Sequence, residues 1–234
     1  GVSVTLGDDA GALTATGGAG VAGDITVTST QAIGANVDNY ETVTIAANST
    51  TATTSAGAAY TSDSAVTSLS ASAAGAAQYL DAALSTSLAT INLSGDNVVT
   101  VSVDADIFDT TLATAPTVTV SGATHLIALD TSSLAADVDM SPVANFVLEG
   151  DHTGAIEVAD NASVTLGAAQ TATDVIGVAG SQSLTVDMDG NGYAGTVQNV
   201  ATLNVTSATA ATLNVQVDAD DDGLSDYRES NLIG

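Results

Sequence analysis

Residues 201–217 read ATLNVTSATAATLNVQV, and the segment ATLNV occurs in them at Ala201–Val205 and again ten residues later at Ala211–Val215. In each copy the apolar Leu and Val are separated by one polar residue. An alternation with a period of two is typical of a β-strand that has one buried face and one solvent-exposed face. The ten-residue repeat favours stacked rungs of a β-solenoid for residues 180–217, although a hairpin gives the same spacing.

The same alternation recurs along the rest of the chain. Ser3–Gly7 (SVTLG) is repeated at Ser163–Gly167, and Gly, Asp and Asn separate the alternating runs of the second half. We therefore expect an all-β fold, either a β-sandwich with Ig-like strands or a β-solenoid. Further strands are predicted at Val2–Leu6, Ile25–Ser29, Glu41–Ile45, Val98–Val103, Thr117–Val120, Ala155–Val158 and Ser183–Val186.

One region departs from this pattern. Ser70–Leu88 is rich in Ala, and its Ala and Leu residues recur at roughly helical spacing, which predicts a short helix near residues 72–86. Gly75 lowers the helix propensity of this segment. The chain is thereby divided into an N-terminal β region with an irregular or helical insert (1–90), a β-rich domain (91–217) and a C-terminal segment (218–234).

The charge of the chain is strongly one-sided. Its 234 residues include 27 acidic residues and a single basic residue, Arg228, which gives a net charge of −26. Nucleic acid is excluded as a partner, because phosphate binding needs clustered Lys and Arg. Membrane insertion is not expected, because the long uncharged runs are rich in Thr, Ser and Gly. So much negative charge destabilises a compact fold unless divalent cations or a salty medium screen it.

The residue types that carry catalysis are scarce. The only basic side chain is that of Arg228, and no nucleophile lies at a recognisable spacing from a base. Neither His125 nor His152 has a partner at metal-ligand or catalytic spacing, so both are interpreted as surface or hydrogen-bonded histidines. Cysteine is absent, and stability must come from burial, backbone ladders or metals. We expect a protein that is not an enzyme.

The strongest chemical signal lies near the C-terminal end, at residues 218–229. Carboxylates occupy positions 1, 3, 5, 9 and 12 of this segment and glycine occupies position 6, as in a twelve-residue calcium loop. Alternate residues of such a loop turn their oxygens towards one cation, and the residue at position 7 supplies its backbone carbonyl. The predicted Ca²⁺ ligands are Asp218, Asp220, Asp222, Leu224, Asp226 and Glu229.

A second, less complete loop begins at Asp187. Asp187, Asp189 and Asn191 match the first three side-chain ligands, and Tyr193 would supply its carbonyl oxygen. Position 12 is Gln198, which cannot bind Ca²⁺ with two carboxylate oxygens. The alternative is a plain β-turn, because Asp-Gly and Asn-Gly are turn signals.

Closely spaced aspartates also occur at predicted strand ends, namely Asp104, Asp106 and Asp109, and Asp137 and Asp139. One such pair is a poor metal site alone. We interpret the pairs as solvated strand ends, with Ca²⁺ shared between neighbouring strands or subunits as the alternative.

The loop Asp218–Glu229 resembles the calcium loops of thrombospondin type 3 repeats in bacterial surface proteins, where the run D-x-D-x-D-G-L-S-D-x-x-E is typical. It differs from an EF-hand, because the preceding Leu213–Val217 is predicted to be a strand. The stretch Val200–Asp222 is similar in texture to bacterial S-layer proteins and RTX-type secreted proteins, although the RTX nonapeptide is missing. These resemblances imply calcium binding and a secreted, cell-surface location.

Together these features predict a calcium-stabilised extracellular structural protein that self-associates into a surface layer, sheath or filament. Like-charged subunits can pack closely only if cations bridge them, and Ca²⁺ prefers the oxygen ligands that this chain offers. Open β edges also invite completion by a neighbouring subunit. The alternative is a calcium-dependent adhesin or stalk module that binds a cell-surface glycan or protein.

Overall fold

The structure, a computed structural model, describes residues 1–6, 12–18, 23–29, 34–38, 40–47, 60–62, 66–73, 77–112, 115–130, 137–177, 182–207 and 213–218. Within these ranges the chain is almost entirely β-strand, which confirms the predicted all-β class. The strands are β1 (Val2–Leu6), β2 (Ala12–Thr16), β3 (Asp24–Ser29), β4 (Gly34–Asp38), β5 (Thr42–Ala47), β6 (Tyr60–Ser62), β7 (Ser68–Ala73), β8 (Gln78–Asp81), β9 (Thr90–Gly95), β10 (Val99–Val103), β11 (Thr117–Gly122), β12 (Leu126–Leu129), β13 (Val138–Asp139), β14 (Asn145–Leu148), β15 (Ala155–Val158), β16 (Ala162–Leu166), β17 (Gln170–Gly177), β18 (Gln182–Asp187), β19 (Tyr193–Gln198), β20 (Val200–Thr206) and β21 (Leu213–Asp218), with a short 3-10 helix, η2 (Ala105–Phe108).

The chain divides into two compact units. Unit 1 contains Gly1–Ile107 and Thr114–Ala128, and unit 2 contains Phe108–Ala113 and Leu129–Gly234. In unit 1 the strands β1-β3-β5-β7-β9-β11 form a six-stranded sheet, and β2-β4-β6-β8-β10-β12 lie in the other sheet. In unit 2 the strands β13-β15-β17-β19-β21 form a five-stranded sheet, and β14-β16-β18-β20 lie in the other.

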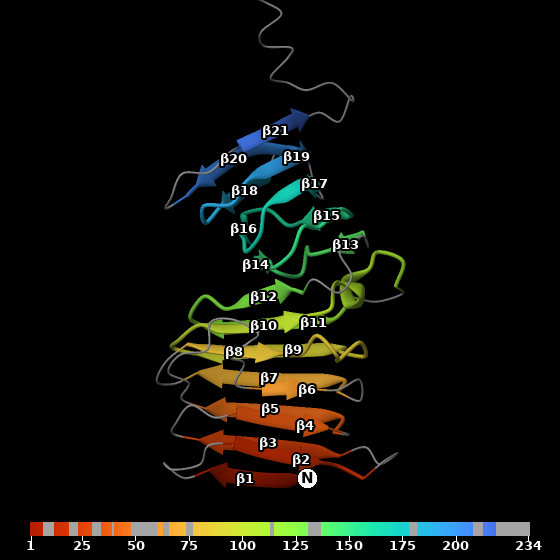
Figure 1. Ribbon diagram of the computed structural model, residues 1–234, viewed down its shortest axis with the longest axis vertical. Helices are drawn as coiled ribbons and strands as arrows, with labels where there is room; N and C mark the ends of the chain where they lie inside the picture. Colours follow the sequence, from red (N-terminus) through yellow and green to blue (C-terminus); the bar gives the residue numbers. More distant parts are fainter. Residues whose placement is uncertain are drawn as a thin grey trace, which may run out of the picture. The chain divides into compact units, whose positions relative to one another are not determined.

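Each unit is a parallel β-solenoid. The chain alternates between the two sheets of its unit, so that one coil contributes one strand to each sheet (Figure 1). Register partners in neighbouring coils are parallel and lie 18 to 27 residues apart in sequence. The solenoid alternative is thereby confirmed, since the strands of Ig-like sandwiches pair antiparallel. The first ATLNV copy lies on β20, and the described part of the second, Leu213–Val215, lies on β21, so the two copies are in different sheets.

Stacked apolar side chains fill the interior of each unit. In unit 1 the register places Ile25, Val43, Leu69 and Ile91 in one column, and all four are buried. Thr, Ser and Asn occupy the alternate, outward positions, as the period of two predicts. Each fully buried aliphatic side chain contributes about 1.5–3 kcal/mol. Other columns are Val27, Ile45, Ala71 and Leu93 in unit 1, and Val138, Ile156, Val175 and Val197 in unit 2.

The helix predicted near residues 72–86 is wrong for the described part of that segment, which contains the end of β7, all of β8 and turns. β7 has a parallel neighbour on both sides, so its backbone groups are satisfied by ladders and not by helical hydrogen bonds. Ala73 is buried opposite Gly95, where an added Cβ would lie 2.4 Å from the Ala73 carbonyl oxygen. Residue 95 must therefore be glycine, and the ladders on both sides of β7 override the high helix propensity of its Ala residues.

Candidate functional site

The predicted calcium loop at 218–229 lies almost wholly outside the described residues. Asp218 ends β21, so the element entering the loop is a strand, as predicted. The predicted ligands Asp220, Asp222, Leu224, Asp226 and Glu229 lie outside the described ranges, and their role stays a prediction.

The second predicted loop is a tight turn that joins β18 to β19. Asp187 ends β18, and its Oδ1 accepts a hydrogen bond from the backbone N–H of Asp189 at 3.1 Å. Asn191 N–H donates to the Met188 carbonyl oxygen at 2.7 Å and closes the turn. Asp189 and Gly190 have φ angles of 43° and 82°, in the left-handed region that Gly, Asn and Asp enter most readily.

This turn is tied to the coils on both of its sides. The side-chain amide of Asn191 donates to the Leu166 carbonyl oxygen at 2.6 Å, and Gly190 N–H donates to the Ser207 hydroxyl at 3.1 Å. Met188 N–H donates to the Thr206 carbonyl oxygen at 2.9 Å. The turn thus contains three of the predicted ligands, Asp187, Asp189 and Asn191. Its geometry is that of a β-turn, the alternative to a metal loop that the sequence left open. Calcium binding here stays a prediction.

Tyr193, the fourth predicted ligand of this loop, is the first residue of β19 and is buried. Its hydroxyl donates to the Thr173 carbonyl oxygen at 3.2 Å. Burial raises the pKa of the Tyr193 phenol above its ordinary value, and the negative charge of Asp174 adds to this rise. The side chain is therefore a neutral member of the core.

A buried polar network lies beside Tyr193, and no sequence motif indicates it. Gln170 begins β17 and is only 2% exposed. Its Nε2 donates to the carbonyl oxygens of Gly150 at 2.7 Å and Ala168 at 3.0 Å, and its Oε1 accepts from His152 N–H at 2.8 Å. The Thr173 hydroxyl lies 2.9 Å from the same Oε1 and also contacts the His152 carbonyl oxygen. The network satisfies backbone groups where a bulge interrupts the pairing of β17 with β19.

Several aspartates of unit 2 link one coil to the next. Oδ1 atoms of Asp137, Asp151 and Asp160 each accept a backbone N–H at 2.8 Å. The donors lie 18 to 23 residues further along the chain, one coil away, and are Ala155, Thr171 and Ser183 respectively.

Other aspartates cap their own turns. Carboxylates of Asp81, Asp104, Asp109 and Asp139, like that of Asp187, accept the N–H two residues ahead. The Thr111 backbone N–H, which donates to Asp109 at 2.7 Å, holds the pKa of Asp109 below its ordinary value, and the Thr111 hydroxyl adds to this. These carboxylates have structural partners at the strand ends.

The described residues contain no group of three or more His, Asp or Glu side chains arranged to hold a metal ion. His125 is buried, with Nδ1 accepting from Val99 N–H at 3.0 Å and Nε2 lying 3.2 Å from the Ser121 carbonyl oxygen. It is thus a hydrogen-bonded core histidine, as interpreted from the sequence. His152 is also buried.

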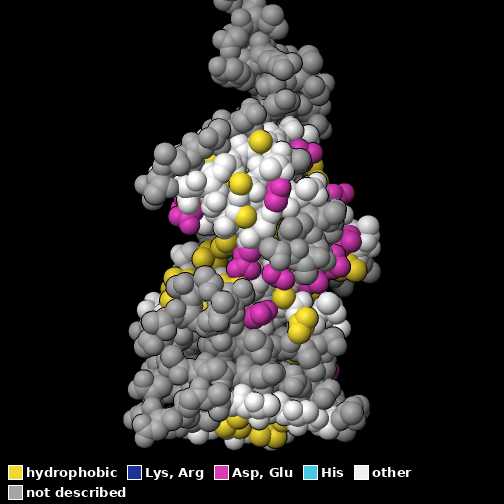
Figure 2. All heavy atoms as spheres, in the orientation of Figure 1, with side chains coloured by type: hydrophobic (Ala, Val, Ile, Leu, Met, Phe, Trp, Pro, Cys, Tyr) yellow, Lys and Arg dark blue, Asp and Glu magenta, His cyan; other side chains and the backbone are white. Residues whose placement is uncertain are grey.

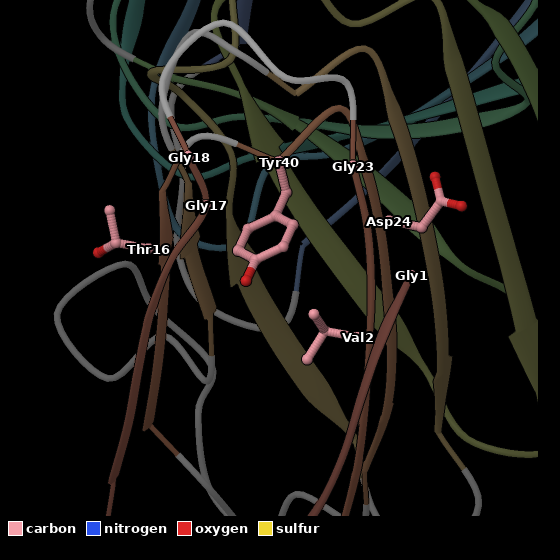
Figure 3. A pocket seen from close by; sticks show the side chains of 8 residues that line it. All are labelled: Gly1, Val2, Thr16, Gly17, Gly18, Gly23, Asp24 and Tyr40. Atoms are coloured by element: carbon pink, nitrogen blue, oxygen red, sulfur yellow. The ribbon is translucent and has the colours of Figure 1, made fainter.

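A pocket of about 260 Å³ opens at the first coil of unit 1. Its lining includes Val2, Tyr40 and four glycines, which are Gly1, Gly17, Gly18 and Gly23. Figure 3 shows the Tyr40 ring directed into the pocket, whereas the side chains of Thr16 and Asp24 point away from it. The sequence signal for this pocket is Gly17-Gly18, which follows β2, a strand that was not predicted.

No protein-family model, curated protein or solved structure matches this chain. In the part of the chain that the structure describes, no helix has the length and apolar character needed to cross a lipid bilayer.

Proposed function

We propose that this protein is a calcium-stabilised extracellular structural protein that self-associates into a surface layer, sheath or filament. The observation that carries the proposal is the combination of a parallel β-solenoid with a net charge of −26 and a single basic residue. A solenoid coil satisfies its backbone only when further coils or a cap cover its ends, so the architecture is suited to stacking.

The charge supports a role for cations. Described carboxylates such as Asp96 and Asp106 are exposed, and acidic side chains gather over the face of unit 2 seen in Figure 2. Two such surfaces repel each other at close range, and a bound divalent cation reverses that interaction. The described residues hold no ready three-carboxylate group, so the proposal assigns Ca²⁺ to the twelve-residue loop at 218–229.

The experiment is a calcium titration with a charge-matched control. Asp220→Asn combined with Asp222→Asn removes two predicted ligands, whereas Asp96→Asn with Asp106→Asn removes the same charge from exposed positions outside the loop. We expect the loop variant to weaken Ca²⁺ binding in calorimetry by about tenfold or more, and the control to bind like wild type.

Association is followed by light scattering before and after a chelator is added. We expect wild type and the control variant to self-associate when Ca²⁺ is present and to dissociate when the chelator is added. Absence of a binding heat in wild type, or association that ignores the chelator, would contradict it. A monomer that binds Ca²⁺ and captures a glycan or protein would instead support the adhesin alternative.

A further inference from the structure

The outward face of the six-stranded sheet of unit 1 consists almost entirely of small hydroxyl side chains. This hydroxyl face is formed by the outward residues of β1, β3, β5, β7, β9 and β11 (Figure 1). The register aligns these residues in three columns, and the columns on either side are Ser and Thr except for Asp24 and Ala46. The middle column contains Ser3, Thr26, Thr44, Ser70, Asn92 and Thr119.

The side chains of the hydroxyl face reach solvent. Ser3 and Thr119, at the two ends of the middle column, are exposed, and the four residues between them are half-buried. The long side chains of Lys, Arg, Glu and Gln, which lose the most conformational entropy when a partner covers them, are absent from the three columns. A partner can therefore cover this face at a low cost in side-chain entropy.

The outward faces of unit 2 carry more charge for their size. Asp139 and Glu157 are register partners on adjacent strands of the five-stranded sheet. The strands β14, β16, β18 and β20 form a smaller face that is also rich in Ser and Thr, but Asp187 ends β18. Because the net charge is −26, two copies repel each other wherever such carboxylates meet without a cation. The hydroxyl face has one carboxylate, Asp24, over six strands, and it lies in a marginal column.

Hydroxyl groups also make this face complementary to itself. A Ser or Thr hydroxyl both donates and accepts hydrogen bonds, whereas an ionised carboxylate only accepts them. Two hydroxyl faces can therefore bond to each other directly, whereas two carboxylate faces need a cation between them. Hydrogen bonding between neighbouring side chains already occurs within the face, since the Asn92 amide donates to the Ser70 hydroxyl at 3.3 Å.

The size of the face sets the strength of such a contact. From the usual spacing of strands and of residues along them, the face measures about 30 Å by 20 Å, or about 600 Å². A standard stable interface covers about 800 Å² on each partner. The face is therefore large enough for a weak, reversible contact between copies.

We infer that two copies of this chain pack their hydroxyl faces against each other in a two-fold dimer. The centre of the face lies between Thr44 and Ser70, which are register partners on the two middle strands, β5 and β7. A two-fold axis through this centre brings Thr44 of one copy close to the same residue of the other. A two-fold contact closes on itself, so growth beyond the dimer needs a further contact. The inference rests on the proposed function and leaves that growth to Ca²⁺.

The experiment places charges at the centre of the hydroxyl face. Thr44→Glu and Thr44→Lys are examined separately and as an equimolar mixture by sedimentation velocity, both with Ca²⁺ and with a chelator in raised salt. Thr185→Glu and Thr185→Lys are the matched controls, because Thr185 is also a half-buried outward threonine, on β18 of unit 2. We expect wild type and the controls to form dimers in the chelator and larger species with Ca²⁺.

Each Thr44 variant alone should dimerise about tenfold more weakly than wild type or worse, because like charges then meet at the two-fold axis. In the mixture Glu meets Lys, so the affinity of the dimer should return to that of wild type. This recovery also shows that both variants are folded.

A cross-link tests the same contact without added charge. The chain contains no cysteine, so Thr44→Cys introduces a single thiol at the centre of the face. A bifunctional maleimide about 10 Å long, the separation of packed sheets, should join two copies of Thr44→Cys and leave Thr185→Cys monomeric.

The outcomes separate this contact from the proposed function. Thr44 variants that dimerise like wild type, or a Thr44→Cys protein that the reagent does not join, overturn the dimer, and association that needs Ca²⁺ still supports the proposed function. A mixture that stays as weak as its two components also overturns the dimer. Dimers that are lost in the Thr44 variants but never grow with Ca²⁺ support the hydroxyl face and contradict the calcium-dependent layer.

Discussion

Gln170→Glu is expected to destabilise unit 2 strongly at neutral pH. The substitution keeps the shape of the side chain but replaces the Nε2 donor with an oxygen. The carbonyl oxygens of Gly150 and Ala168, at 2.7 and 3.0 Å, then lose their donor and face a carboxylate. Each buried polar group left unsatisfied costs about 1–3 kcal/mol, so the two together cost about 2–6 kcal/mol. That is a large share of the roughly 5–15 kcal/mol by which a domain is stable.

The loss of stability in Gln170→Glu should be smaller at acidic pH, because burial favours the neutral form of the new carboxyl group. A carboxyl at this position is removed from water, which raises its pKa in the folded state above the unfolded value of about 4.3. The protonated acid is also an O–H donor and can satisfy one of the two carbonyls. The variant therefore regains stability as the pH falls through the raised pKa, by about 1–3 kcal/mol, and loses it again as the pH rises.

The measurement is urea unfolding followed by circular dichroism at pH 7 and pH 5, with amide hydrogen exchange in β17 and β19 to localise the effect. Thr185→Glu on β18 is the matched control, because it adds the same charge at a half-buried position whose register partners, Ser163 and Asn204, are uncharged. Its difference from wild type should change little between the two pH values. If the difference between Gln170→Glu and wild type is below about 0.5 kcal/mol at pH 7, or is equal at both pH values, the assigned role of the amide is refuted.

Three further predictions concern packing and charge. Gly195→Ala places a Cβ 1.9 Å from the Thr173 carbonyl oxygen of the neighbouring coil and should lower the free energy of unfolding by about 1–3 kcal/mol in denaturant. Gly167→Ala, whose closest contact is 3.0 Å, should lower it less, and equal effects would contradict the close approach at Gly195. Ile45→Ala empties a buried position in the core and should cost about 2–5 kcal/mol, whereas the outward Thr44→Ala should change stability by about 0.5 kcal/mol or less. Asp109 should titrate below an ordinary aspartate in a carbon-detected NMR experiment, so its stabilising contribution is present at neutral pH and lost as the pH falls through the lowered pKa; an ordinary titration would argue against its turn hydrogen bond.

Local alternation was enough to predict many of the strands and their inward faces. Val2–Leu6 and Ala155–Val158 were predicted with the bounds that the structure has, and Val43 and Ile45 are buried as their alternation requires. Alternation reports which face of a strand is covered, and carries no information about which strand lies beside it. The choice between a solenoid and a sandwich therefore stayed open.

The features that the sequence did not predict arise from contacts between residues that are distant in sequence and lie in neighbouring coils. Ala71 and Ala73 have high helix propensity, but the parallel ladders of β7 with β5 and β9 hold them in a strand. No pattern marks Gln170 in the sequence, because two of its four partners, Gly150 and His152, come from the preceding coil and a third, Thr173, adjoins a bulge. For the loop at 187–193 the sequence indicated the turn correctly, while its calcium ligation stays a prediction.

Register partners in neighbouring coils are separated by different numbers of residues. Ile25 and Val43 are 18 residues apart, whereas Ile91 and Val118 are 27 apart, yet both pairs are in register. The extra residues lie between the register-paired strands, so the buried columns stay in register. Insertions at the corners, or duplication of a whole turn of the chain, can therefore accumulate without repacking. The same corners are the natural places to graft a foreign peptide for display.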